Sequence, residues 1–480
     1  MTNARLFSRT AGGVALLTGL FAAASSAHAD EAATPRPHIV FVVVDDLNHD
    51  LGISGVDVQT PNFDRLAERG LVFTNAHTNA PVCNPSRTSF LLGQFPPTTG
   101  VRDNNTHFRE LPQHRDAVTL PQHFKENGYQ TVGAGKIFHN GWRPSRHPHS
   151  KFHDRRISWN DYAEFPVGTP RPKPVPNDWH GGAVRSYWGK SFWWAGMDLA
   201  DEDTGDWKNA DFIADRLASP RGDRPMFLAC GIFRPHLPFA TPQSYFDLYD
   251  LPDTPTDSLP GYKKNDAADL PPTGKKWANK TGVHRPLTQR KLWGHAVEAY
   301  RASTTFADAR LGQVLDAYDR SPAKDNTYMI VTSDHGFQLG EKGAWCKFSF
   351  WERSTRVPFL VVGPGIKPGV SERTVSLIDL YPTLIALAGL PPRQGLQGKD
   401  LTPLFENPDM PWDSVARVFH EKVDHEAIID EDFRYIRYAN GDEELYDRKA
   451  DPHDWHNLAR QPAHADTLDR YRAKRWFGKP

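Results

Sequence analysis

The segment PVCNPSRTSFLLG occupies residues 81–93 of this chain. Pro85 is a residue type favoured at the first position of a helix, the apolar residues 90–92 supply a face that a core can bury, and Gly93 ends the helix. The segment therefore predicts a short helix that begins just after Cys83, and we expect the rest of the chain to be organised around it.

The predicted start of this helix favours an anion. Its first N–H groups have no partner within the helix, and the helix dipole is positive there, although Ser86 and Thr88 can satisfy some of the amides. Arg87, the fourth residue after Cys83, adds a permanent charge with paired donors that suit sulfate or phosphate. Cys83 is therefore a candidate nucleophile, and read on spacing alone it is equally well a small buried apolar residue.

A second candidate feature follows the first predicted strand. Residues 38–44 form a continuous apolar run typical of a strand buried on both faces, and Asp45 and Asp46 follow it directly. Two adjacent carboxylates repel each other unless a cation or a proton joins them. The pair predicts a site for a hard divalent cation, with a helix cap or a solvated turn as the alternative.

Three more predicted strands end in ionisable residues. In an α/β fold the carboxyl ends of parallel strands meet at one edge of the sheet, where ligands bind, so these positions favour chemistry over surface decoration. The residues are Lys136 and His139 after strand 130–134, His236 after strand 226–233, and Asp334 and His335 after strand 328–332. Lys347 follows farther along, within Trp345-Cys346-Lys347.

These motifs, in this order, resemble the formylglycine-dependent type I sulfatases over nearly all of the chain that follows the N-terminal leader. They are the strand ending in Asp45-Asp46, Cys83-x-Pro85-Ser86-Arg87, Gly135-Lys136-x-x-His139, Pro235-His236-x-Pro238, Ser333-Asp334-His335-Gly336 and Leu445-Tyr446-Asp447. Asn84 departs from the small residue usual in the second motif, and Leu92 stands where Thr is usual. Within the family, Arg234-Pro235-His236 and Trp345-x-Lys347 look most like the iduronate-2-sulfatase group.

The resemblance implies a fold and an activity. The expected fold is an alkaline-phosphatase-like α/β sandwich with a large mixed central sheet flanked by helices, plus a smaller C-terminal subdomain with an antiparallel sheet. The expected enzyme is a sulfuric ester hydrolase that removes O-sulfate from a sulfated oligosaccharide or polysaccharide. Its nucleophile would be formylglycine, made from Cys83 by a formylglycine-generating maturation enzyme.

The resemblance also assigns residues to roles. A Ca²⁺ shell is implied at Asp45, Asp46, Cys83, Asp334 and His335. A sulfate-handling set is implied at Arg87, Lys136, His139, His236 and Lys347, with Lys136, His236 and Lys347 also binding substrate. His139 is the candidate base and His236 the candidate acid that protonates the departing sugar oxygen.

Other functions remain open from the residues. A phosphoesterase of the same fold would use Ser or Thr with two zinc ions, and needs more His and Asp ligands than the motifs supply. A choline sulfatase would leave the basic loops 143–156 and 166–176 unexplained. A non-catalytic binder of sulfated glycans would be favoured by loss of Cys83 or of one of the three Asp residues, all of which are present.

The N-terminus predicts export. Arg5 and Arg9 precede the apolar residues 11–24 and then Ala-His-Ala at 27–29, the order of a signal peptide cleaved after residue 29. The protein is therefore expected in the periplasm or outside the cell. The apolar stretch is too short to span a membrane, and nothing later is long enough. The remaining chain has 55 basic and 58 acidic residues, a balance that argues against a nucleic-acid partner.

We expect a catalytic domain over residues 30–409 and a smaller C-terminal subdomain over 410–480. Strands are predicted in the latter at 416–420, 427–429 and 433–438, with Asn-Gly at 440–441 as a hairpin turn. Oligomeric state is not predicted.

The chain has only three cysteines, so it is not built on disulfides, and Cys230 and Cys346 are expected to be buried thiols more than a pair. Basic residues in 143–156 and 166–176, followed by Trp188, Trp193 and Trp194, suit an anionic sugar. Solvated loops held by buried Trp side chains are an equally good interpretation of these segments.

Overall fold

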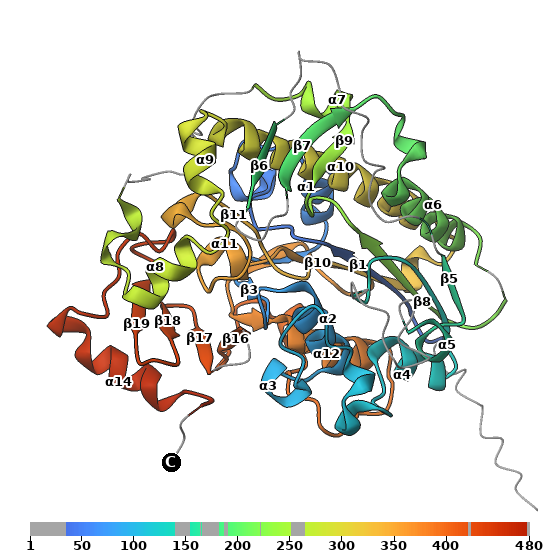
Figure 1. The fold of residues 1–480 in the computed structure, drawn as a ribbon. Coiled ribbons are helices and arrows are strands. Elements are labelled where there is room, and N and C mark those ends of the chain that lie inside the picture. Colours follow the sequence, from blue (N-terminus) through green and yellow to red (C-terminus); the bar gives the residue numbers. More distant parts are fainter. Residues whose placement is uncertain are drawn as a thin grey trace, which may run out of the picture. The chain divides into compact units, whose positions relative to one another are not determined.

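Strand β1 (His38–Val44) lies inside an eight-stranded sheet, between β10 (Thr327–Ser333) and β8 (Met226–Ile232) (Figure 1). Both neighbours run parallel to β1, and β4 (Gln130–Gly135) runs parallel to β8. All four strands are almost completely buried, as their continuous apolar runs predict. The four predicted strands are confirmed, and their carboxyl ends lie at one edge of the sheet.

The outer strands make the sheet mixed. On one side β5 (Asp161–Ala163) runs parallel to β4. On the other side β13 (Phe359–Val362) runs antiparallel to β10, and β2 (Leu71–Phe73) runs antiparallel to β13. The edge strand β14 (Gly369–Ser371) is again parallel to β2. The predicted mixed central sheet is confirmed.

This computed structural model describes residues 35–139, 154–163, 165, 182–186, 191–220, 222–250, 265–420 and 424–477. The predicted signal peptide, most of the basic loops 143–156 and 166–176, and Trp188 lie outside these residues. Contacts gather the chain from Arg36 onward into one compact unit. Among the described residues, no helix has both the length and the apolar character needed to cross a membrane.

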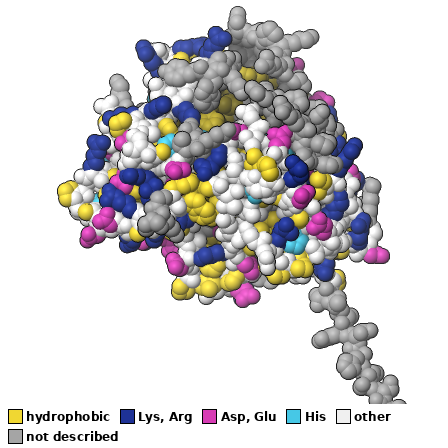
Figure 2. Space-filling view, turned by 60° about the horizontal axis from the view of Figure 1, so that its bottom comes forward, with side chains coloured by type: hydrophobic (Ala, Val, Ile, Leu, Met, Phe, Trp, Pro, Cys, Tyr) yellow, Lys and Arg dark blue, Asp and Glu magenta, His cyan; other side chains and the backbone are white. Residues whose placement is uncertain are grey.

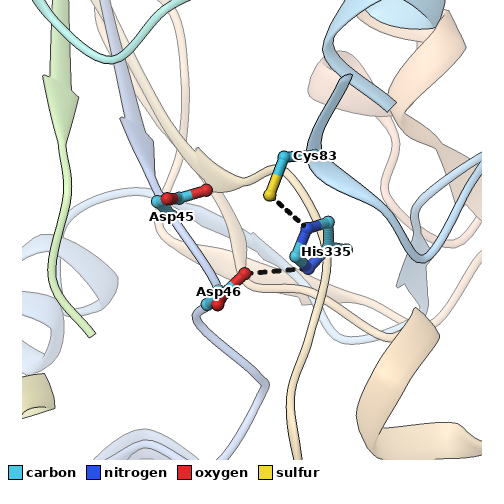
Figure 3. Close-up of side chains that lie close together, drawn as sticks. All are labelled: Asp45, Asp46, Cys83 and His335. Carbon is cyan, nitrogen blue, oxygen red and sulfur yellow. Dashed lines mark hydrogen bonds and ion pairs between the residues drawn. The ribbon is translucent and has the colours of Figure 1, made fainter. Parts of the chain in front are cut away.

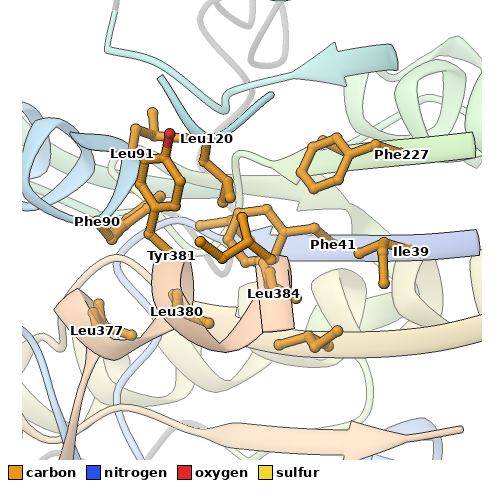
Figure 4. Close-up of a cluster of buried hydrophobic side chains, with 14 of the residues drawn as sticks. Ile39, Phe41, Phe90, Leu91, Leu120, Phe227, Leu377, Leu380, Tyr381 and Leu384 are labelled. Atoms are coloured by element: carbon orange, nitrogen blue, oxygen red, sulfur yellow. The ribbon is translucent and has the colours of Figure 1, made fainter. Parts of the chain in front are cut away.

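One face of the sheet is covered by α2 (Cys83–Leu92), α4 (Leu120–Glu126) and α12 (Leu380–Leu387). Side chains alternate along a strand, so Ile39 and Phe41 of β1 point to this face. Figure 4 shows them packed among apolar side chains of the three helices, including Leu384.

The opposite face is covered by α1 (Pro61–Ala67), α6 (Gly205–Ala218) and the long α10 (Trp293–Arg320). Val40, Val42 and Val44 of β1 point to this side. The apolar three- and four-residue spacing between residues 297 and 318 predicts such a helix, and α10 confirms it. The two helix layers enclose the sheet, as expected for the predicted sandwich.

Helix α2 differs from the prediction in its first residue. It begins at Cys83 itself after the N-cap Val82, so Pro85 is the third helical residue. Proline is tolerated there because the first turn makes no use of its missing N–H. Ser86 and Thr88 do not cap the helix: the Ser86 hydroxyl donates to the Asp334 carbonyl, 2.5 Å away.

A three-stranded sheet lies outside the central one. Strand β7 (Ser191–Met197) pairs antiparallel with β6 (Gly182–Arg185) and parallel with β9 (Phe239–Pro242). Trp194 is buried in its core, whereas Trp193 is half-buried. The interpretation of a solvated loop held by a buried Trp is therefore right about the burial of Trp194 but wrong about the loop, because Trp194 lies within strand β7.

The remaining α-helices and strands of the described residues are short. They are β3 (Ala76–His77) with β15 (Val375–Ser376), β11 (Gln338–Leu339) with β12 (Trp345–Cys346), α3 (Pro96–Thr99), α5 (Arg155–Ser158), α7 (Gln243–Phe246), α8 (Pro272–Ala278), α9 (His284–Gln289), α11 (Glu352–Thr355), α13 (Thr402–Glu406) and α14 (Ala465–Ala473). All three cysteines are buried and free, which confirms the predicted buried thiols at Cys230 and Cys346.

The C-terminal region forms the predicted antiparallel sheet. Strands β16 (Ala416–His420), β17 (His425–Ile429), β18 (Phe433–Arg437) and β19 (Glu443–Asp447) pair in chain order. The predicted turn lies between β18 and β19, where Gly441 has φ 98°. The domain boundary at residue 409 stays a prediction, because the whole region from Arg36 clusters as one unit.

A buried ion network joins this sheet to the segment that follows β12. Arg434 of β18 donates Nη1 to the Phe350 carbonyl at 2.7 Å and to Thr355 Oγ1 at 2.9 Å. Its guanidinium also pairs with Glu352 of α11 and lies 3.0 Å from Asp454. Because Arg434 is fully buried, its charge depends entirely on these partners.

Replacing Arg434 with Leu is expected to lower the free energy of unfolding by about 3–5 kcal/mol, because Glu352 and Asp454 lose a buried counter-charge. Urea unfolding followed by circular dichroism measures it. The matched control is Arg472→Leu, whose ion pair with Glu443 is exposed and should contribute less than about 1 kcal/mol. Equal losses in the two variants would contradict a structural role for the buried network.

Candidate active site

Four parallel strands bring polar residues to one edge of the central sheet. Asp45 N donates to the Ile232 carbonyl at 2.9 Å, and Lys136 N donates to the Gly231 carbonyl at 3.1 Å, so the ends of β1 and β4 are both tied to β8. The residues delivered there are Asp45 and Asp46 after β1, Lys136 and His139 after β4, His236 after β8, and Asp334 and His335 after β10.

Gly135 allows the strand ends to approach this closely. A Cβ at this position would lie 1.9 Å from the Gly231 carbonyl oxygen, and the residue has φ +71°. Only glycine fits both the contact and the backbone conformation. The glycine of the Gly-Lys-x-x-His motif therefore sets the exit of Lys136 from β4.

Lys347 reaches the same edge from outside the central sheet. Cys346 and Phe348, on either side of it, both have left-handed backbone conformations, with φ 72° and 82°. Phe348 N donates to the carbonyl of Pro81 at 3.2 Å, close to the start of α2. The turn thus attaches Lys347 to the helix that carries Cys83.

Four of the predicted metal ligands form one buried group, shown in Figure 3. One ligand atom from each of Asp45, Asp46, Cys83 and His335 lies within 4.8 Å of the others. His335 Nε2 is 3.3 Å from Cys83 Sγ, and His335 Nδ1 is 3.4 Å from Asp46 Oδ1. Residues separated by more than 250 positions in sequence therefore share one small volume.

Asp334, the fifth predicted ligand, lies beside this group. Its Oδ1 accepts from the backbone N–H of Asp46 at 3.1 Å and of His335 at 3.0 Å. Its Oδ2 accepts from Arg87 Nε at 2.8 Å and is 3.6 Å from His335 Nε2. Asp334 is thus fixed in place by several donors next to the other four residues.

Arg87 connects both acidic strand ends. It donates Nε to Asp334 and Nη2 to Asp45 at 3.1 Å, and Nη1 donates to the backbone carbonyls of Lys136 and Ile137. Its guanidinium is completely buried, so these acceptors satisfy nearly all of its N–H groups. Arg87 therefore holds the carboxylates and the β4 exit in one arrangement.

Two lysines complete the charge balance. Lys347 Nζ lies 2.5 Å from Asp46 Oδ1 and 3.2 Å from Cys83 Sγ, and Lys136 Nζ donates to Asp45. Burial would raise the pKa of Cys83, but Lys136, Lys347 and His335 hold that pKa well below its usual range. The nucleophile position is therefore strongly electropositive.

The acidic and basic groups of the site shift one another's pKa values. Burial raises the pKa of Asp334 to about 7, with Arg87 opposing the rise. Burial would lower the pKa of His335, but Asp334 and Cys83 raise it to about 9. Such perturbed values are typical of functional sites.

The two remaining histidines lie near different members of the group. His139 is close to Cys83, and burial lowers the pKa of its imidazole. His236 places Nδ1 2.6 Å from the carbonyl of Leu237 and Nε2 3.9 Å from Asp46 Oδ2. Because a carbonyl only accepts, Nδ1 of His236 carries a proton and Nε2 is the atom that faces the site.

Several residues that hold the site were not identified from sequence. Tyr300 of α10 donates to the Asp46 carbonyl at 2.8 Å and accepts from Asn48 N at 2.9 Å, which supports the left-handed turn at Asp46, φ 65°. Ser333 Oγ accepts from Leu47 N at 3.0 Å. In the sequence, Tyr300 is one of the apolar positions of a helix, and nothing marks it as part of the site. Ser333 could have been found, because it belongs to the Ser-Asp-His-Gly motif.

The donor set fits a hard cation. Three carboxylates, from Asp45, Asp46 and Asp334, are buried together, and such a group is costly unless positive charge joins it. Carboxylate oxygens are the ligands that Ca²⁺ prefers. A divalent cation could replace the ammonium groups that now neutralise Asp45 and Asp46.

Comparison with known families gives one consistent result. The family model described as "Sulfatase" matches residues 37–390, and the model described as "N-sulphoglucosamine sulphohydrolase, C-terminal" matches residues 340–475. The first covers more than half of the chain and includes every candidate residue named above.

Individual relatives agree with this match. A sulfatase of Formosa agariphila is 33% identical, covering 88% of this chain and 83% of its own. The iduronate 2-sulfatase of Mus musculus is 34% identical, covering 78% of this chain and 73% of its own. A solved 2-O GAG sulfatase has a TM-score of 0.70 at 23% identity, covering 92% of this chain and 91% of that one. The last likeness supports the predicted alkaline-phosphatase-like fold.

Proposed function

This chain belongs to the sulfatase family of sulfate ester hydrolases, and we propose that its substrate is an O-sulfated carbohydrate, a glycosaminoglycan or algal polysaccharide fragment. The proposed nucleophile is formylglycine made from Cys83, assisted by a bound Ca²⁺. One observation carries the proposal: Cys83 Sγ lies 3.2 Å from Lys347 Nζ and 3.3 Å from His335 Nε2, beside two buried aspartates.

Formylglycine at position 83 agrees with the chemistry of the neighbouring groups. A hydrated aldehyde supplies one hydroxyl to attack sulfur and a second that lets the sulfate leave, whereas a thiol would form a stable adduct. The change also replaces a sulfur with oxygen among Asp45, Asp46 and His335. That replacement makes the donor set mainly oxygen, as Ca²⁺ requires.

Asp45, Asp46, Asp334, His335 and residue 83 would hold the Ca²⁺. When bound, the ion lowers the pKa of the attacking hydroxyl and attracts a sulfate oxygen. The charges of the chain itself favour this arrangement: three carboxylates are matched by Arg87, Lys136 and Lys347. With a divalent cation added, the site has surplus positive charge for an anionic ester.

The two lysines are the proposed sulfate contacts. Lys347 Nζ lies 3.2 Å from Cys83 Sγ, and Lys136 Nζ donates to Asp45 in the same group. Either ammonium can turn from its aspartate to a sulfate oxygen once a cation neutralises that aspartate. A contact of this kind, made as charge builds on the transferring group, contributes about 3–4 kcal/mol. Arg87 contributes by holding the carboxylates of Asp45 and Asp334 and the backbone that follows β4.

The two histidines have separate proposed roles. His139, buried beside residue 83, is the candidate base that takes the hydroxyl proton and regenerates the aldehyde. His236 presents Nε2 to the site and is the candidate acid. As the ester O–S bond breaks, the sugar oxygen keeps the electron pair and takes the proton from Nε2.

We also propose export to the periplasm or the medium, and a formylglycine-generating enzyme as the maturation partner. A sulfated glycan is the expected partner in function, and no nucleic acid or membrane is expected. The nearly neutral composition supports this expectation. On the face shown in Figure 2, Lys and Arg are interspersed with Asp and Glu side chains.

The substrate class is tested with defined sulfated oligosaccharides of heparan, dermatan, ulvan and carrageenan, with choline sulfate and a phosphate monoester beside them. We expect sulfate release from at least one oligosaccharide, with kcat/KM at least about tenfold above that for choline sulfate. Ion chromatography of free sulfate measures it. Faster hydrolysis of choline sulfate or of the phosphate ester would favour the small-substrate or phosphoesterase alternatives. Tight glycan binding without turnover would favour a non-catalytic binder.

A further inference from the structure

The loop that carries His236 follows strand β8 and is anchored by the carboxylate of Asp206. Asp206 lies in the first turn of α6, and both of its oxygens point at the backbone that follows β8. Phe233 N donates to Asp206 Oδ1 at 2.7 Å, and Arg234 N donates to Oδ2 at 3.1 Å. One side chain thus satisfies two successive N–H groups where the strand ends.

The side chain of Arg234 binds the backbone farther along the same loop. Its Nε donates to the Ala240 carbonyl at 2.9 Å, and its Nη1 donates to the His236 carbonyl at 3.0 Å. His236 N also donates to the Phe233 carbonyl at 3.0 Å. The main chain on both sides of His236 is therefore held by Arg234, whose own backbone is held by Asp206.

The anchor formed by Asp206 and Arg234 is buried. Asp206 is 3% exposed and Arg234 is 1% exposed, so water does not compete for their hydrogen bonds. The ring of Phe233 packs against His236, with 4.7 Å between the two ring centroids. Lys136 Nζ lies 5.2 Å from the centroid of the Phe233 ring. Displacement of the loop would therefore move the His236 imidazole directly.

We propose that Asp206 is a positioning residue for departure of the sugar: by holding residues 233–240 it keeps His236 Nε2 directed at the site beside Asp46. The inference rests on the proposed function, in which His236 protonates the leaving oxygen. Asp206 itself touches no reacting atom. Its loss should affect the step that needs the proton and leave the attack on sulfur largely intact.

The variant Asp206→Asn separates these steps. An amide can accept from only one of the two N–H groups, and its own NH₂ would face the other, so the loop shifts while side-chain volume is kept. Two substrates with different leaving groups show whether the proton transfer or the attack on sulfur is affected. A sugar alkoxide needs protonation, whereas 4-nitrophenolate leaves without it.

We expect kcat for a sulfated oligosaccharide to fall about 100-fold and kcat for 4-nitrophenyl sulfate to fall less than about threefold. Asp211→Asn, on an exposed face of the same helix, is the matched control and should change neither value. If Asp206→Asn does not fold, Arg234→Lys provides the test. It keeps the charge, loses the paired contacts to the loop and should give the same split.

Equal loss on both substrates, or no loss on the oligosaccharide, would overturn the positioning role. A wild-type protein that hydrolyses neither substrate would instead reject the proposed function, and this inference with it. The split in variants of an active wild type is therefore informative about Asp206 alone.

Discussion

Replacing Cys83 with Ala is expected to lower kcat/KM for sulfate release by about 10⁴-fold or more, both for 4-nitrophenyl sulfate and for a sulfated oligosaccharide. The substitution removes the only side chain from which the proposed nucleophile can be made. The fold should survive, because Ala suits the first turn of α2 and the lost volume is one sulfur atom.

Mass spectrometry of the peptide that contains residue 83 gives an independent measure. In a host with a maturation enzyme, the wild-type peptide should carry an aldehyde in place of the thiol. Cys230→Ala is the matched control, because it removes another fully buried thiol from strand β8 and should retain turnover. Retained activity in Cys83→Ala, or a fully active protein with an unmodified thiol, would refute the assignment.

Removal of the proposed Ca²⁺ is expected to have the second largest effect. Exhaustive treatment with a chelator should reduce turnover by about 100-fold or more, and added Ca²⁺ should restore it. The three buried carboxylates would then be neutralised by side chains alone, among them Arg87, Lys136 and Lys347, so the lysines remain bound to Asp45 and Asp46 instead of turning to sulfate.

The variant Asp46→Asn tests the same site by thermal unfolding, without reference to activity. Asn tolerates the left-handed conformation of Asp46 as well as Asp does, so the backbone turn is kept while a charged ligand is lost. Ca²⁺ should raise the unfolding temperature of the wild-type protein and of the exposed control Asp57→Asn, but not of Asp46→Asn. An equal rise in all three proteins would place the ion elsewhere.

Local sequence was a good guide to the elements of this fold. The apolar run at residues 38–44, the helical spacing from 297 to 318 and the Asn-Gly turn at 440–441 each depend on neighbours within a few residues. The start of α2 was misplaced because Pro is compatible with several positions of a first turn, and propensity does not choose between them.

The candidate site was predictable to the extent that its residues follow strands. Asp45, Lys136, His236 and Asp334 all stand just after apolar runs, and parallel pairing of those runs brings their ends together. Tyr300, Arg434 and Asp206 gave no comparable signal. Each resembles an ordinary helix or strand residue in its own segment, and binds the backbone of another segment, between 27 and 254 residues away in the chain.

The sequence alone determined the four central strands and the long helix α10, and which ionisable side chains stand where those strands end. Only the tertiary structure decided how those charges pair: that Arg87 bridges Asp45 and Asp334, and that Lys347 meets both Asp46 and Cys83. The physical reason is that periodicity and propensity are local. The pairing of buried charges depends instead on distances between segments far apart in the chain, 301 residues for Lys347 and Asp46, and these distances exist only once the sheet is assembled.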